Sequence, residues 1–199
     1  MAKTILISTN NPGKQAEIFA ILKDERLILR TPEDLSISLD VEETGSTYRE
    51  NAQIKAAAFC KASGLPALAD DSGLEVEALR GAPGLFSARY LRAPGSTQSE
   101  RRIQLIRDLE GKPRPWTARF VCTMALATPD GKMHFSFGTC AGEIITEERG
   151  ENGFGFDPIF LCEGTNRTTA ELNMTEKNRI SHRAKAAKGI LPFILSLDE

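Results

Sequence analysis

Two adjacent aspartates end an apolar run in LPALADDSGLEVEAL, residues 65–79, and this stretch constrains the fold more than any other. The apolar residues predict a buried strand over PALADD, residues 66–71. Side chains of neighbouring strand residues point to opposite faces of a sheet. Asp70 and Asp71 therefore cannot both lie on a solvated face, and we expect one carboxylate to point toward the core.

The composition sets the scale of the fold and narrows the partners. The chain has 199 residues, of which 41% are hydrophobic, so we expect a single domain over residues 1–199, built as two lobes with no separable linker. The 25 basic and 27 acidic residues give a net charge of −2. Domains that bind nucleic-acid polymers carry a basic excess, so this balance argues against such a partner and leaves a single nucleotide open.

The cysteines and the first residues indicate a cytoplasmic protein. The four cysteines lie far apart with no C-x-x-C pair, which argues against a zinc site and is typical of free thiols in a reducing compartment. The apolar run in MAKTILIST is too short for a signal peptide, and no stretch approaches the roughly 20 apolar residues of a membrane span. We therefore expect no membrane partner.

Helices and strands alternate in the first half of the chain. TILIS, residues 4–8, predicts a buried strand that leads into a turn and a helix, with Asn10 or Asn11 as the N-cap of that helix. Thr47 and Glu50 form a T-x-x-E capping box that begins a second helix, and Gly64 ends it. A further capping box in GSTQSERRIQLIRDLEG begins a third helix.

The second half adds antiparallel strands and a final helix. A P-D-G turn at residues 129–131 predicts a hairpin. Residues 176–195 predict one helix, with Ser181 as a possible cap and Pro192 marking a break near its end. The whole pattern predicts an α/β fold in which a mixed β-sheet carries helices on its faces.

The segment TNNPGK, residues 9–14, is a candidate anion-binding loop. A strand that runs into a glycine-containing turn and a helix presents free backbone N–H groups at the positive end of the helix. Lys14 in the first turn opposes the helix dipole unless an anion joins it. The spacing is not that of a Walker A motif, so a simple helix start is the alternative.

Carboxylates on two segments form a candidate metal site. Glu42 and Glu43 precede the helix that carries Lys55, and together with Asp70 and Asp71 they would give oxygen ligands suited to Mg²⁺. A solvated acidic loop and a surface lysine are the alternative. The D-S-G triplet that begins at Asp71 also matches aspartic proteases, but one copy per chain would require a dimer.

Two further segments carry candidate base-binding residues. In GFGFDP, residues 153–158, an aromatic side chain could stack on a base, with an aspartate to accept from a ring N–H; core packing is the alternative. EKNRISHR places Lys177, His182 and Arg183 at a turn into a helix. These donors suit carbonyl or phosphate oxygens, and a surface position is the alternative.

Together, the segments TNNPGK, EETGSTYRENAQIKA, LADDSGLEVEALRGAPGLFSARY, GFGFDPIF and EKNRISHR resemble the noncanonical purine nucleoside triphosphate pyrophosphatases (inosine/xanthosine triphosphatases). The resemblance runs from Ile5 to the final helix in the order of the family. It implies an elongated α/β fold with a central mixed sheet, two lobes with the active-site cleft between them, and a homodimer. It also implies Mg²⁺-dependent cleavage of the purine nucleotides ITP, dITP and XTP to the monophosphate and pyrophosphate, which clears deaminated purines.

The resemblance also implies roles for individual residues. Asp71 would be the general base and a metal ligand, and Glu42 would be a further metal ligand. The implied substrate contacts, from the phosphate loop to the base pocket, are Thr9, Asn10, Asn11, Pro12, Gly13, Lys14, Lys55, Ser72, Phe154, Gly155, Phe156, Asp157, Lys177, His182 and Arg183. The family commonly has tyrosine at the position of Phe156, and we expect little effect from the missing hydroxyl.

This set of residues fits phosphoanhydride hydrolysis, which depends mainly on positioning and charge neutralisation. Lys14, Lys55 and Mg²⁺ would offset the triphosphate charge, and Asp71 would deprotonate the water that attacks the α-phosphorus. Arg183 or His182 would donate to the 6-keto oxygen of hypoxanthine or xanthine and would meet the 6-amino group of adenine donor to donor.

A nucleotide-binding sensor without catalysis is the second hypothesis. It would share the phosphate and base loops but would not need the metal carboxylates Glu42 and Asp71. Release of pyrophosphate from ITP with Mg²⁺ separates the two hypotheses.

Overall fold

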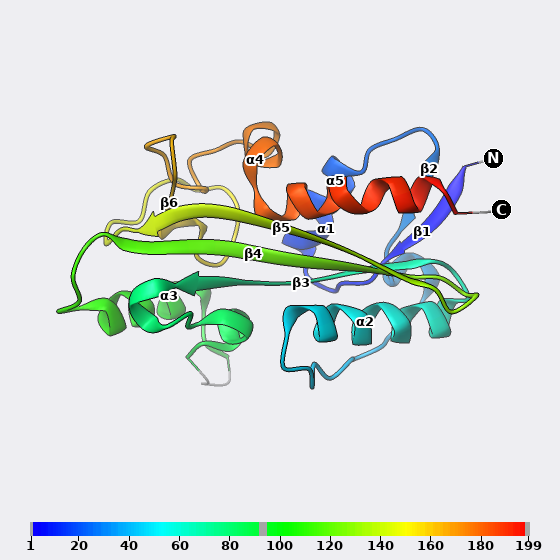
Figure 1. Ribbon diagram of the computed structural model, residues 1–199, viewed down its shortest axis with the longest axis horizontal. Helices are drawn as coiled ribbons and strands as arrows, with labels where there is room; N and C mark the ends of the chain where they lie inside the picture. The colour runs from blue at the N-terminus through cyan, green and yellow to red at the C-terminus, as the bar shows by residue number, and fades with distance from the viewer. Residues whose placement is uncertain (1, 92–94, 198–199) are drawn as a thin grey trace. The chain divides into compact units, whose positions relative to one another are not determined.

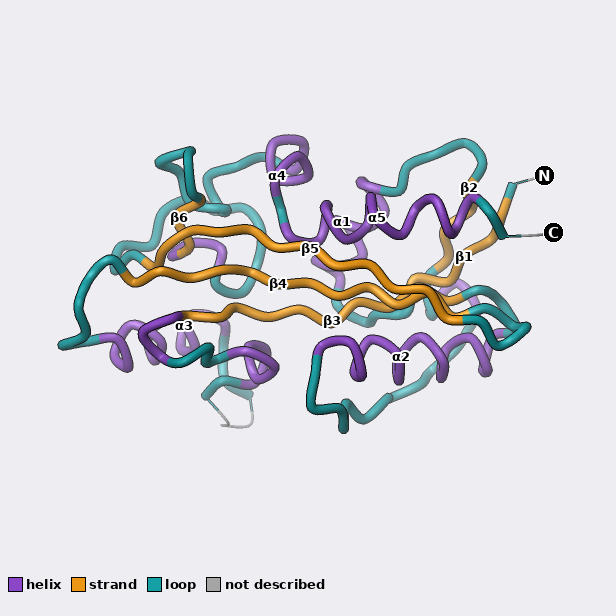
Figure 2. The backbone as a smooth tube through the Cα atoms, in the orientation of Figure 1, coloured by secondary structure: helices purple, strands orange, loops and turns teal. Residues whose placement is uncertain are grey.

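A computed structural model describes residues 2–91 and 95–197 of the chain, and its elements are shown in Figures 1 and 2. The strands are β1 (Lys3–Ile7), β2 (Leu27–Arg30), β3 (Ala67–Val76), β4 (Trp116–Ala127), β5 (Met133–Ile144) and β6 (Phe160–Cys162). The helices are α1 (Pro12–Ile21), α2 (Tyr48–Ser63), α3 (Gln98–Leu109), α4 (Met174–Ile180) and α5 (His182–Leu195).

The six strands form one mixed sheet in the order β2-β1-β3-β4-β5-β6. β1 pairs in parallel with β2 and with β3, whereas β5 and β6 are antiparallel. Helices flank this sheet, so the predicted fold class is confirmed. Within the described residues, no helix combines the length and the apolar character needed to cross a membrane.

The chain forms two compact units. The first comprises residues 1–71, 122–138 and 182–199, and the second comprises residues 72–121 and 139–181. Strands β3, β4 and β5 contribute residues to both units. The expectation of a single domain without a separable linker stays a prediction.

The first unit has a hydrophobic cluster on each face of its strands. Ile5 and Leu68 lie in one buried cluster with residues of α1 and α5. Leu6 and Ala69 lie in a second cluster with residues of α2. This alternation is the two-residue period of a strand. Even-numbered residues of β3 in this unit therefore face α1 and α5, and odd-numbered residues face α2.

The second unit has its own core, which includes the buried residues Leu105 and Leu109 of α3. Phe120 and Phe160 pack in this core with ring centroids 4.5 Å apart. Phe156 belongs to the same cluster and is 4% exposed. The aromatic residue at the position where the family commonly has tyrosine is therefore a core side chain.

Most of the predicted helix ends are confirmed. Asn11 caps α1 and accepts the N–H of Lys14, Gly64 ends α2 with φ +69°, and α3 begins with the full capping box of Thr97. The box of α2 differs in one contact. Thr47 accepts the N–H of Glu50, but the Glu50 carboxylate accepts from Ser46 in the preceding turn instead.

Three predictions about where elements end are wrong. β3 does not end at the aspartates but continues through Ser72 and Gly73 to Val76, because these small residues stay extended instead of turning. The final helix is two helices, α4 and α5, because Ser181 between them is extended with φ −64° and ψ 153°. Pro192 lies inside α5, which continues to Leu195, so the expected break is absent.

Candidate active site

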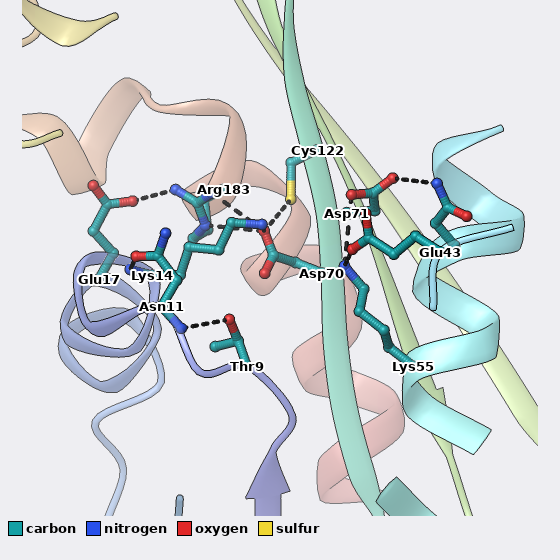
Figure 3. Close-up of polar contacts among 11 residues, drawn as sticks. Thr9, Asn11, Lys14, Glu17, Glu43, Lys55, Asp70, Asp71, Cys122 and Arg183 are labelled. Atoms are coloured by element: carbon teal, nitrogen blue, oxygen red, sulfur yellow. Dashed lines mark hydrogen bonds and ion pairs between the residues drawn. The ribbon is translucent and has the colours of Figure 1, made fainter. Parts of the chain in front are cut away.

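β3 places its two aspartates on opposite faces of the sheet (Figure 3). Asp70 follows the alternation of Leu68 and points toward α1 and α5, whereas Asp71 follows Ala69 and points toward α2. The exposed fractions are 1% for Asp70 and 6% for Asp71. Both carboxylates are therefore buried, each in a different chemical environment.

Two cations surround Asp70. The Nζ of Lys14 lies 3.0 Å from Asp70 Oδ2. Arg183 donates to the same oxygen from Nη2 at 3.2 Å and from Nε at 3.3 Å, while its Nη1 donates to Glu17. Burial alone would raise the pKa of Asp70, but the charges of Lys14 and Arg183 outweigh it and the pKa is lowered. Asp70 is therefore ionised and fixes two cations on this face.

Asp71 has a weaker set of partners. Asn51 Nδ2 donates to Asp71 Oδ2 at 3.2 Å, and Lys55 Nζ lies 3.5 Å from Oδ1. Lys55 is shared with Glu43, whose Oε1 is 2.6 Å from Nζ. The pKa of Asp71 is raised above the ordinary aspartate value, mainly by burial. The positive charge of Lys55 lowers the pKa but offsets burial only in part, and the negative charge of Glu43 raises it further. One negative charge is in excess among Asp71, Glu43 and Lys55.

Helix α2 provides both polar partners of Asp71. Asn51 and Lys55 are four residues apart and so lie on the same face of the helix. The Asn51 side-chain oxygen accepts the N–H of Gly45 at 2.8 Å, which leaves the amide nitrogen to donate to Asp71. A Cβ at Gly45 would lie 2.7 Å from that oxygen, so glycine is required for this approach.

The loop before α1 has the features of an anion-binding helix start. Asn11 Oδ1 accepts the N–H of Lys14 at 3.1 Å, and Thr9 Oγ1 accepts the N–H of Asn11 at 3.2 Å. The first turn has no acidic residue. Asn10, Asn11 and Pro12 are exposed, whereas Thr9, Gly13 and Lys14 are half-buried. The positive end of α1 and the ammonium of Lys14 thus belong to one segment.

The loop of the second unit is organised around a buried ion pair. Lys177 Nζ is 2.5 Å from Asp157 Oδ2, and that oxygen also accepts the N–H of Phe154 at 2.8 Å. Asp157 Oδ1 accepts from Thr169 Oγ1 at 2.8 Å. The Lys177 ammonium lies 5.4 Å from the centre of the Phe154 ring, and Phe154 is half-buried. Of the two aromatic residues in this loop, Phe154 is the accessible one.

The structure brings together only some of the residues selected from the sequence. Lys14 and Arg183 meet at Asp70, and Lys55 meets Asp71. In the second unit, Phe154, Asp157 and Lys177 form the cluster around the ion pair. Of the other selected residues, Ser72 is half-buried and His182 is buried.

Glu42 is not among these contacts. It is exposed, and its neighbour Glu43 is the residue paired with Lys55. Glu17 was not selected from the sequence, although it lies three residues after Lys14 on one helix face. Asn51 was also missed, although its spacing of four residues from Lys55 could have indicated it.

Two acidic side chains, Asp71 and Glu43, lie near each other on the Asp71 face, where both contact Lys55. Across residues 2–91 and 95–197, no three His, Cys, Asp or Glu side chains converge in a way that would hold a metal ion. Asp71 and Glu43 supply two carboxylates, which is the usual protein contribution to a Mg²⁺ site that takes its other ligands from water and substrate phosphates. The donor chemistry therefore fits Mg²⁺.

Comparison with known proteins gives a consistent result. The sequence model of the Ham1 family matches residues 5–193. The dITP/XTP pyrophosphatase of Synechocystis sp. is 46% identical over 186 residues, covering 92% of this chain and 91% of that protein. The corresponding enzyme of Halalkalibacterium halodurans is 45% identical, covering 94% of this chain and 96% of that protein. A solved HAM1 protein from Coxiella burnetii superposes with a TM-score of 0.87 at 40% identity, covering 99% of this chain and all of that one. The chain belongs to the Ham1 family.

Proposed function

We propose that this chain hydrolyses the noncanonical purine nucleotides dITP, ITP and XTP to the nucleoside monophosphate and pyrophosphate. The two relatives described above are named dITP/XTP pyrophosphatases, which favours catalysis over a nucleotide-binding sensor. Within the chain, the proposal is carried by the buried carboxylate of Asp71, which has a raised pKa and lies beside a lysine and a second carboxylate.

Asp71 is the proposed general base. A raised pKa makes its carboxylate a stronger base toward water than an ordinary aspartate. The Asn51 amide donates to Oδ2 and fixes the orientation of the carboxylate. A water held by Asp71 would lose its proton to this group as it attacks the α-phosphorus, and pyrophosphate would leave.

The phosphates are bound by the segment Thr9–Lys14 and by Lys55. The N-terminus of α1 offers backbone N–H groups, and Lys14, held by Asp70, adds a fixed positive charge. Lys55 is a second cation beside the general base. These charges stabilise the negative charge that develops on the departing pyrophosphate.

Mg²⁺ is the proposed cofactor. Asp71 and Glu43 would hold it, and Glu42 remains a candidate ligand from the sequence. When bound, the ion would neutralise phosphate charge.

The purine base is proposed to contact the loop from Phe154 to Asp157, with Lys177. Phe154 offers an accessible ring, and stacking of a base on such a ring is worth about 1–3 kcal/mol. The assignments of Ser72 and His182 to substrate binding stay predictions. So does the reading of the 6-keto oxygen by Arg183, whose guanidinium donates to Asp70 and Glu17.

Release of pyrophosphate from dITP with Mg²⁺ tests the proposed function. We expect turnover that is lost on chelation with EDTA and restored by added Mg²⁺, with ATP a poor substrate. Binding of dITP without release of pyrophosphate would instead establish the sensor.

The assembly and the compartment are further proposals. The family resemblance supports a homodimer, and sedimentation equilibrium at twice the chain mass would test it. A cytoplasmic location is supported by the four free cysteines of the chain.

A further inference from the structure

Two side chains of α3 hold the backbone of one residue, Gly155, in the Gly153–Asp157 loop. Gln98 Oε1 accepts the N–H of Gly155 at 2.7 Å, and Arg102 Nη1 donates to the carbonyl oxygen of the same residue at 2.9 Å. Gln98 and Arg102 are four residues apart and lie on one face of α3. Both hydrogen-bonding groups of Gly155 are thus fixed by one helix.

The guanidinium of Arg102 is itself held in place. Its Nε and Nη2 donate to the two carboxylate oxygens of Glu148, each at 2.8 Å. This paired geometry orients a planar guanidinium and is stronger than a neutral hydrogen bond. The Arg102 side chain is only 12% exposed. Nη1 is therefore presented to Gly155 in one direction.

Gly155 is the point of the loop that most needs such support. Its φ of +65° lies in the left-handed region, which glycine adopts readily. No atom lies within 4 Å of the position that a Cβ would occupy, so no neighbouring side chain restrains the residue on that side. On one side of it, Phe156 is anchored in the core, and on the other side Phe154 is half-buried. The orientation of the Gly155 peptide therefore sets how the Phe154 ring is presented.

We propose that Gln98 and Arg102 are positioning residues that hold Phe154 in the orientation required to bind the purine base. This inference rests on the proposed function and assigns α3 a part in it. Because the two residues act on the base loop, they set the affinity for the nucleoside part of the substrate. They do not set the affinity for the phosphate chain, which depends on Lys14 and Lys55.

The test compares a complete substrate with a probe that lacks the base. Arg102→Ala and Gln98→Ala are assayed for kcat and KM with dITP, and for inhibition of that reaction by inorganic triphosphate. Arg107→Ala is the matched control, because it removes the same charge from an exposed position of the same helix. We expect KM for dITP to rise about tenfold in Arg102→Ala and in Gln98→Ala and to stay at the wild-type value in Arg107→Ala, with Ki for inorganic triphosphate unchanged in all three.

Conservative variants separate positioning from stability. Gln98→Glu keeps an oxygen acceptor for Gly155 and is expected to restore most of the affinity for dITP. Arg102→Lys keeps a cation but cannot pair with both oxygens of Glu148, so an intermediate KM is expected. Thermal unfolding of each variant shows whether the fold is intact.

Each outcome decides the inference. A folded Arg102→Ala or Gln98→Ala variant with the wild-type KM for dITP would overturn it, as would an equal rise in KM and in Ki for inorganic triphosphate. If Arg102→Ala does not fold, the Gln98 pair decides alone. Failure of the wild-type protein to release pyrophosphate from dITP would overturn the proposed function itself.

Discussion

The two faces of β3 present the same side chain in opposite settings. Asp70 meets two cations, and its pKa is lowered, whereas Asp71 shares one cation with Glu43, and its pKa is raised. Of these two adjacent residues of one strand, Asp70 is thus an anchor that is ionised at neutral pH and Asp71 is a candidate base. Both residues are buried aspartates, and Asp70 is the more buried of the two, so the opposite pKa shifts come from the charged side chains that each face meets.

Because of this contrast, we expect substitution of Asp70 to reduce stability and substitution of Asp71 to reduce activity. The Asp70 face is a neutral network in which Glu17 and Asp70 balance Lys14 and Arg183. Removing the charge of any one of these four residues leaves an opposite buried charge without compensation, so the free energy of unfolding falls. The Asp71 face carries excess negative charge. Replacing Asp71 by a neutral residue therefore lowers the rate of hydrolysis and also removes the free-energy cost of burying this charge.

The largest expected effect is on turnover by Asp71→Asn. The amide cannot accept the proton of the attacking water, so we expect kcat for dITP to fall about 10³-fold while the protein stays folded. The measurement is pyrophosphate release at saturating dITP, with unfolding in urea as the check on the fold. Turnover at the wild-type rate would remove Asp71 from the role of base.

The next effect is on stability, in Asp70→Asn. Lys14 and Arg183 would lose the charge that compensates them, and breaking a buried pair in this way costs about 3–5 kcal/mol. The free energy of unfolding from urea titration measures this loss. A destabilisation no larger than that of Asp71→Asn would mean that the two faces are equivalent.

A smaller effect, on the Mg²⁺ concentration needed for activity, should distinguish the neighbouring residues Glu42 and Glu43. Glu43 contacts Lys55 beside Asp71, whereas Glu42 is exposed, so Glu43→Gln should raise the Mg²⁺ concentration needed for half-maximal activity about tenfold. Glu42→Gln is the matched control and should leave that concentration unchanged. The reverse result would restore Glu42 as the ligand, as the family resemblance implies.

The pH dependence of stability should differ in sign between the two carboxyls. Asp70, with a lowered pKa, stabilises the fold above its unfolded-state pKa of about 4, and this contribution is lost as the pH falls below it, at about 1.4 kcal/mol per pH unit. Asp70→Asn should therefore lose less stability on acidification than the wild type.

Asp71, with a raised pKa, binds its proton more readily in the folded state, so Asp71→Asn should gain stability near neutral pH.

Local sequence patterns predicted the parts of this site that depend on neighbours in the chain. An asparagine cap at residue 10 or 11, which the structure places at Asn11, the Gly64 stop and the opposite orientation of the two aspartates all follow from helix and strand geometry within a few residues. The 3.6-residue period of helices would also have indicated that Glu17 and Asn51 share faces with the selected lysines.

Contacts between distant segments could not be predicted in this way. Arg183 and Asp70 are 113 residues apart, and no local pattern indicates that they pair. The choice of Glu43 over Glu42 depends on the path of a loop. The length of β3 was also missed, because Ser72-Gly73 stays extended. Ser181 does cap a helix, as predicted, but it ends α4 and separates it from α5, so the division of the final helix into two was missed.

The most direct test of the opposite settings is the titration of the two carboxyl groups by carbon-detected NMR in the absence of Mg²⁺. Signals are assigned with Asp70→Asn and Asp71→Asn. We predict that the Asp71 carboxyl titrates above the ordinary aspartate range and that Asp70 stays ionised well below it. Two titrations within the ordinary range, or a higher pKa for Asp70 than for Asp71, would contradict the account.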